Sequence, residues 1–123
     1  MDDKKATIYN AFLEDPTLKS IIRDRLYFFY NKNNAVYPQI TYFKIDDLGD
    51  YSYGDCGDIS NLYYQIEAWD DFENGSNIPS MDSSIDKVMN ELGFHRTYSF
   101  IGYDDKSKIY RLVMRYEGLI KNR

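Results

Sequence analysis

The strongest indication of a fold lies in residues 58–70, which read DISNLYYQIEAWD. Within this stretch apolar side chains alternate with more polar ones at a period of two, as in a strand with one buried face. The first set is Leu62, Tyr64, Ile66 and Ala68, and the second is Tyr63, Gln65, Glu67 and Trp69. The stretch therefore predicts a β-strand whose first set meets a hydrophobic core.

Three other segments have the periodicity of amphipathic helices. The first covers residues 6–14. The second begins at Asp15-Pro16, the pattern of an N-cap followed by proline at the first helical position, and continues to about residue 25. The third covers residues 79–92 and is followed by Gly93, a residue typical of helix C-termini.

The remaining segments favour strands. They are residues 26–30, 39–45, 95–103 and 108–118, the last two joined by a polar turn at 104–107. The resulting order is α, α, β, β, β, α, β, β. It predicts one α+β domain over residues 1–123, with a single antiparallel sheet of about four to five strands and two to three helices packed on one face.

The expected core consists of the apolar residues on the side of each predicted helix or strand that faces inward. It comprises Ile8, Phe12, Leu18, Ile22, Tyr64, Ile66, Val88, Leu92, Leu112 and Met114.

Composition excludes several classes of function. The net charge of −5 argues against direct nucleic-acid binding, which needs a basic face. One cysteine and one histidine exclude an internal disulfide framework and the common Cys-rich or multi-His metal sites. No apolar run approaches the roughly 20 residues of a membrane span, and Met1 to Lys5 does not begin a signal peptide. We expect a protein of a reducing cytoplasm, without a membrane partner.

Residues 46–57 are rich in aspartate and glycine and nearly free of aliphatic side chains. A metal site is one interpretation, because hard cations take clustered carboxylate oxygens. A calcium loop would end in a bidentate glutamate, and no glutamate occurs between Glu14 and Glu67. A solvated flexible loop is the favoured interpretation, and a small metal-dependent enzyme remains an alternative.

No catalytic motif is apparent. His95 could act as a general base and Cys56 as a nucleophile, but neither lies in a pattern that supplies an orienting group or an oxyanion site. We therefore expect His95 to be an ordinary strand residue and Cys56 an incidental thiol. The sequence predicts no enzyme activity, no cofactor and no metal.

The aromatic content points to a protein interface. Thirteen tyrosines and seven phenylalanines exceed what a core of this size needs, and tyrosine is enriched at interfaces. The alternative is that the tyrosines cover a small sheet with their hydroxyl ends in water. The candidate interface residues are Asp46, Asp47, Asp50, Tyr51, Tyr53, Asp55, Trp69, Arg111 and Arg115.

Four stretches together resemble the tail-completion, or tail-terminator, proteins of long-tailed bacteriophages and prophages. They are YPQITYFKIDD (37–47), YYQIEAWDD (63–71), VMNELGFHR (88–96) and FIGYDDKSKIYRLVMRYEG (100–118). With the helices before them, the resemblance covers about residues 6 to 118. It rests on core periodicity and turn residues and carries no catalytic signature.

The resemblance implies a structural role without a cofactor. Such a protein forms a homo-oligomeric ring, a hexamer in this family, that caps the tail tube and stops its polymerisation. Its partners are the tail tube protein and the head-side connector protein, and it is found in the virion tail after assembly in the host cytoplasm. The family has no strict functional motif to transfer to particular residues.

A different class of function is an acidic phage-encoded inhibitor that binds a host protein.

Overall fold

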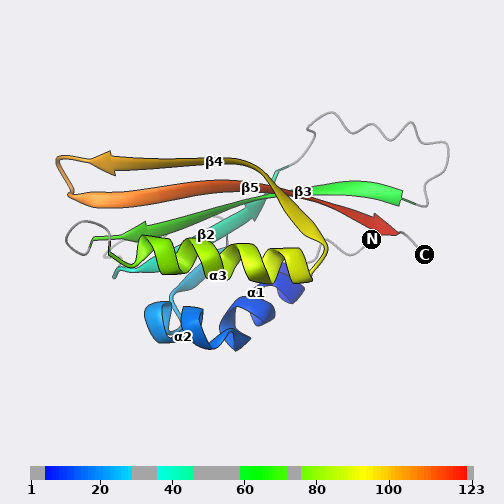
Figure 1. Ribbon diagram of the computed structural model, residues 1–123, viewed down its shortest axis with the longest axis horizontal. Helices are drawn as coiled ribbons and strands as arrows, with labels where there is room; N and C mark the ends of the chain where they lie inside the picture. Colours follow the sequence, from blue (N-terminus) through cyan, green and yellow to red (C-terminus); the bar gives the residue numbers. More distant parts are fainter. Residues whose placement is uncertain (1–4, 29–35, 46–58, 72–75, 122–123) are drawn as a thin grey trace.

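The computed structural model describes residues 5–28, 36–45, 59–71 and 76–121. Helices and strands follow one another in the order expected from the sequence (Figure 1). They are α1 (Lys5–Glu14), α2 (Pro16–Ile22), β1 (Leu26–Phe28), β2 (Gln39–Lys44), β3 (Ile59–Asp70), α3 (Ile78–Glu91), β4 (Phe94–Asp104) and β5 (Ile109–Lys121). This is an α+β fold with one sheet, as predicted.

The sheet has five strands in the order β1-β2-β3-β5-β4. Three of its strand pairs are antiparallel, whereas β1 lies parallel to β2, so the sheet is mixed and the purely antiparallel prediction is wrong for this pair. Arg25 gives the physical reason. Its Nε donates to the Pro38 carbonyl at 2.7 Å and its Nη2 to the Ile21 carbonyl at 3.1 Å. These two bonds tie the end of α2, which β1 follows, to the start of β2. Because β1 and β2 therefore begin at the same end of the sheet, they run in the same direction.

The described helices α1, α2 and α3 all lie on one face of the sheet (Figure 1). The core fills the space between the two layers, and nine of the ten predicted core side chains are buried there. The exception is Leu92, which is partly buried and packs against the edge of the core. It follows the last residue of α3, where Gly93 with a φ of 96° turns the chain toward β4.

Asp15 begins α2 in the way the sequence predicts. Its Oδ2 accepts a hydrogen bond from the Leu18 amide at 3.0 Å, and its Oδ1 lies 3.2 Å from the Lys87 ammonium on α3. Asp15 is only 6% exposed, and its carboxylate both caps one helix and joins it to another.

Replacing Asp15 by alanine should lower the free energy of unfolding by about 1 to 2 kcal/mol, because N-cap removal leaves helix amides unpaired. Urea denaturation followed by circular dichroism measures this. The matched control is Asp24→Ala, an exposed aspartate beyond the C-terminus of α2, which should change stability by less than about 0.5 kcal/mol. Equal effects of the two substitutions would show that the cap contributes nothing.

Candidate functional site

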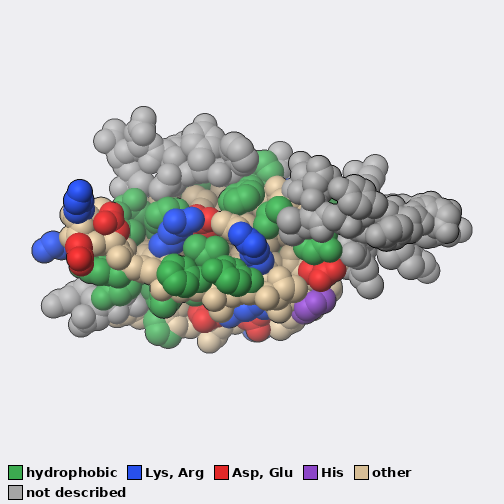
Figure 2. Space-filling model, turned by 90° about the horizontal axis from the view of Figure 1, so that it is seen from above, with side chains coloured by type: hydrophobic (Ala, Val, Ile, Leu, Met, Phe, Trp, Pro, Cys, Tyr) green, Lys and Arg blue, Asp and Glu red, His purple; other side chains and the backbone are tan. Residues whose placement is uncertain are grey.

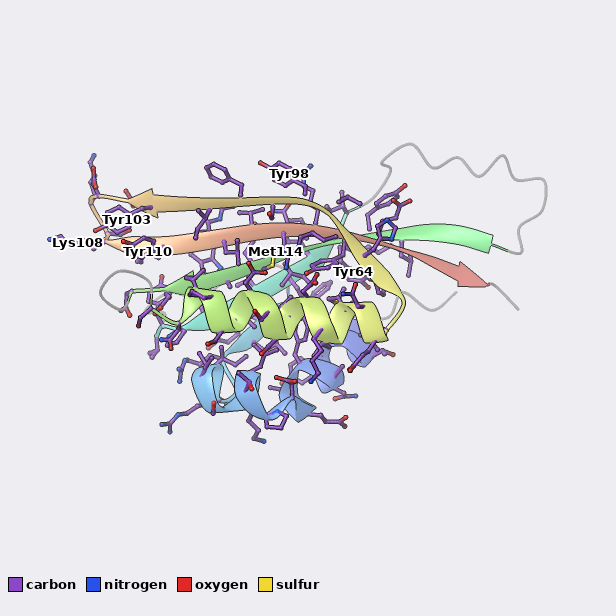
Figure 3. The ribbon with its side chains drawn as sticks, in the orientation of Figure 1. Tyr64, Tyr98, Tyr103, Lys108, Tyr110 and Met114 are labelled. Carbon is purple, nitrogen blue, oxygen red and sulfur yellow. The ribbon has the colours of Figure 1, made fainter. Side chains whose placement is uncertain are left out.

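The candidate site lies on the face of the sheet that the described helices do not cover. Successive side chains of a strand point to opposite faces, so the polar set of β3 points away from the core. Figure 3 shows Tyr98 on this outer side of the sheet, whereas Tyr64 and Met114 lie toward α3. We call it the helix-free face.

A hydrogen-bonded chain of polar side chains links β3 to β5 on the helix-free face. Arg115 Nε donates to Gln65 Oε1 at 3.0 Å, and Gln65 Nε2 donates to Glu67 Oε2. Arg111 Nη2 donates to the same Glu67 oxygen at 3.0 Å. Gln65 and Glu67 are both buried, so their hydrogen bonds to the arginines satisfy polar groups that would otherwise be costly to bury.

Aromatic rings hold the two guanidinium groups in place. The Arg111 Cζ lies 5.1 Å from the centre of the Trp69 ring, and the Arg115 Cζ lies 5.2 Å from the centre of the Tyr98 ring. Trp69 is itself fixed, because its Nε1 donates to Thr41 Oγ1 at 3.0 Å. Cation–π contacts of this geometry orient the arginines without removing them from solvent.

The stacked side chains border a shallow groove of about 570 Å³. Two of its aromatic side chains are strongly exposed, Tyr98 at 47% and Phe100 at 56%. Figure 2 shows hydrophobic side chains on this side of the molecule with Lys or Arg side chains on both sides of them. We name the set Trp69, Tyr98, Phe100, Arg111 and Arg115 the aromatic-arginine patch.

The patch carries positive charge on an acidic chain. Arg111 is paired with the Glu67 carboxylate, whereas Arg115 bonds the neutral amide of Gln65 and stacks on the Tyr98 ring. Within the described residues no carboxylate lies within ion-pair distance of Arg115. Its Nη donors are therefore available to a partner carboxylate, in a chain whose net charge is −5.

The structure brings three of the predicted interface residues together in the patch: Trp69, Arg111 and Arg115. The other predicted interface residues lie outside the described residues, as does Cys56. Those interface residues are Asp46, Asp47, Asp50, Tyr51, Tyr53 and Asp55.

Tyr98 and Phe100 were not among the predicted interface residues. They join the patch because β4 pairs with β5 so that Tyr98 lies opposite Arg115 and Phe100 opposite Val113. That register depends on an irregularity between Arg96 and Tyr98, which nothing in the sequence marks.

A second polar cluster lies on the helix side of the sheet and joins β4 to α3. Arg96 donates to Asp82 and, at 2.8 Å, to the hydroxyl of Tyr116, which itself donates to Asp86 Oδ1 at 2.9 Å. Burial disfavours the charge on Arg96, but its hydrogen bonds to Asp82 and Tyr116 outweigh burial and raise the pKa of the guanidinium. Burial raises the pKa of the Tyr116 hydroxyl far above its usual value. The cluster therefore keeps a protonated tyrosine and a charged arginine, an arrangement suited to holding α3 on the sheet.

His95 lies at the start of β4 and is largely exposed, with its Nε2 3.9 Å from Glu117 Oε1. Across the described ranges, the acidic, histidine and cysteine side chains form no group of three that could hold a metal ion. None of the described helices is long and apolar enough to cross a membrane.

Comparison with protein-family models and with curated proteins found no match for the chain.

Proposed function

We propose that this protein is a structural assembly subunit that binds other protein chains through the aromatic-arginine patch. The observation that carries the proposal is the pair of arginines stacked on aromatic rings beside exposed Tyr98 and Phe100. Trp, Tyr and Arg are the residues most enriched at the energetic centres of protein interfaces. Pre-positioned side chains also lose little conformational freedom on binding, which favours association.

The more specific proposal is a tail-completion protein of a long-tailed phage or prophage. Its support is the sequence resemblance of residues 6 to 118, together with an α+β fold that leaves one sheet face without a described helix. In this role a hexameric ring of subunits caps the tail tube, ends its polymerisation and joins the tail to the head-side connector. The protein is then a component of the virion tail, assembled in the host cytoplasm, with no catalytic activity or cofactor.

A closed ring places demands on the surface of each subunit. Cyclic symmetry beyond two subunits uses heterologous contacts, in which one patch meets a different patch of the next subunit. The aromatic-arginine patch is suited to one half of such a contact, because it combines apolar area with a guanidinium that lacks a carboxylate partner among the described residues.

Deletion of the gene from its phage should give DNA-filled heads without tails and tails of abnormal length, because head assembly and packaging do not need the tail ring. Electron microscopy of lysates and plaque counts measure this. The wild-type gene supplied in trans should restore plaques. Normal infectious particles from the deletion would overturn the structural role and leave the host-protein inhibitor as the better candidate.

Complementation by Arg115→Glu tests the patch within this role. We expect it to fail, because a carboxylate there cannot stack on Tyr98 in the same way and repels an acidic partner. The matched control is Lys19→Glu, which makes the same charge change on exposed α2 and should complement fully. Full complementation by both variants, with both proteins folded, would remove the patch from the proposed function.

A further inference from the structure

The outer edge of β4 offers a second surface. β4 is the last strand in the sheet order, so one side of its backbone has no neighbouring strand among the described residues. Figure 1 shows it along the border of the sheet away from β2. An unpaired strand edge presents a row of amide and carbonyl groups that can pair with another strand.

The side chains of β4 are exposed on both faces of the sheet. Tyr98 and Phe100 lie on the helix-free face, whereas Ile101 and Tyr103 lie opposite Leu112 and Tyr110 on the other face. Ile101 is 53% exposed and Tyr103 is 49% exposed. A further strand alongside β4 would place its own side chains next to both rows, so pairing would bury apolar surface on both faces.

Residues 98–103 lack the usual protection of an edge strand. Their sequence is YSFIGY, with no charged residue and no proline. Native proteins usually protect long edges with lysine, proline, bulges or short strands, and here the irregularity between Arg96 and Tyr98 lies before the uncharged stretch. The edge is therefore competent for pairing over these positions.

We propose that two copies of this protein associate through antiparallel pairing of their β4 edges, with Ile101 of each copy opposite Ile101 of the other. A two-fold axis perpendicular to the sheet then extends one sheet across both copies and keeps both helical layers on the same side.

Charge and size favour this register. With Ile101 on the axis, Tyr98 lies opposite Asp104 of the second copy, so Arg115, stacked on Tyr98, faces a carboxylate. The two-fold axis gives the same attraction a second time, between Arg115 of the second copy and Asp104 of the first. Phe100 lies opposite Gly102 of the second copy. Within each copy the Phe100 ring lies over Gly102, 3.1 Å from where a glycine Cβ would stand, so the two Phe100 rings come side by side across the new strand pair.

The neighbouring registers are less favourable. An axis at Gly102 would place Tyr98 and its stacked Arg115 opposite Lys106, which brings like charges together. An axis at Phe100 would leave Arg115 facing Gly102, so the attraction between Arg115 and a carboxylate of the second copy would be lost. The charged residues near the uncharged stretch therefore favour the register with Ile101 on the two-fold axis.

The dimer does not depend on the proposed function, but it constrains it. A two-fold contact closes on itself and cannot propagate into a ring, so ring contacts must use surfaces other than the β4 edge. One strand edge buries less than the roughly 1,200 to 2,000 Å² of a stable interface, so the dimer should be weak and dependent on concentration.

Cysteine cross-linking of the purified protein tests the register. In a Cys56→Ser background, Ile101→Cys should form a disulfide-linked dimer under mild oxidation, because directly opposed Cα atoms lie about 4.5 to 5.5 Å apart in an antiparallel pair. The matched control is Thr97→Cys, which is also at an exposed position of the same strand but does not meet its own copy. Mixed Ser99→Cys and Tyr103→Cys proteins should cross-link to each other faster than either does to itself.

Equal cross-linking of Ile101→Cys and Thr97→Cys would show random collision and overturn the proposal. Sedimentation over a concentration series gives an independent measurement, in which the wild type should shift from monomer toward dimer and Ile101→Lys should stay monomeric. A wild type that stays monomeric at all concentrations, with Ile101→Lys blocking tail joining in the phage, would assign the edge to a different protein and also overturn the dimer. Because cross-linking and sedimentation use purified protein, their failure leaves the deletion experiment unaffected.

Discussion

Replacing Ile66 by alanine should lower the free energy of unfolding by about 2 to 5 kcal/mol, which is the usual cost of deleting a buried aliphatic side chain and leaving a cavity. Ile66 lies at the middle of β3 with no exposed surface, between Tyr42 on β2 and Met114 on β5. Both neighbours are fully buried, so the surrounding structure has little freedom to collapse into the space. Chemical denaturation of the purified protein measures the loss.

Two further substitutions make the result specific to the core. Ser99→Ala changes an exposed position on β4 and should alter stability by less than about 0.5 kcal/mol. Leu92→Ala should cost less than Ile66→Ala, because Leu92 is only partly buried at the end of α3. A loss below about 1 kcal/mol for Ile66→Ala would contradict the placement of the core between the sheet and the helices.

The sequence predicts the fold well where one periodic pattern is long and unambiguous. The alternation in β3 runs from Leu62 to Trp69, and the buried side chains of α3 follow the helical spacing of its apolar residues. The Asp15-Pro16 pair marks the start of α2 because its capping bond is local and needs no tertiary partner. Local signals of this kind are readable from the chain alone.

The errors arise where long-range contacts decide the outcome. The direction of β1 depends on Arg25 reaching Pro38, a contact between residues that are far apart in the sequence. Leu92 has the periodicity of α3 but follows its last residue, where the chain turns toward β4, and it is only partly buried. Neither result follows from spacing within one element.

Part of the candidate site can also be predicted from local patterns in the sequence, and part of it depends on contacts between strands. Alternation along β3 and β5 places Trp69, Arg111 and Arg115 on one face, so three members of the aromatic-arginine patch were predictable. Tyr98 and Phe100 required the ladder register between β4 and β5, which the irregularity after Arg96 sets. Sequence spacing also does not show that Arg115 has no carboxylate partner among the described residues, because that depends on its contacts with the Gln65 amide and the Tyr98 ring.

Replacing Arg96 by methionine should lower the free energy of unfolding by about 2 kcal/mol, because it removes charge-assisted hydrogen bonds that hold β4 to α3. Arg96 bonds Asp82 and the Tyr116 hydroxyl and lies 3.5 Å from Asp86 Oδ1. The expected loss is smaller than for a fully buried ion pair, since both aspartates are about two fifths exposed and water solvates them once the guanidinium is gone.

Two comparisons isolate the contribution of these hydrogen bonds. His95→Met changes the preceding, largely exposed residue and should alter stability by less than about 0.5 kcal/mol. In a double-mutant cycle, Arg96→Met and Tyr116→Phe should be coupled by at least about 0.5 kcal/mol, because the two side chains bond each other directly. Additive effects in that cycle, or an Arg96→Met loss no larger than that of His95→Met, would show that the packing of α3 against the sheet does not depend on the guanidinium.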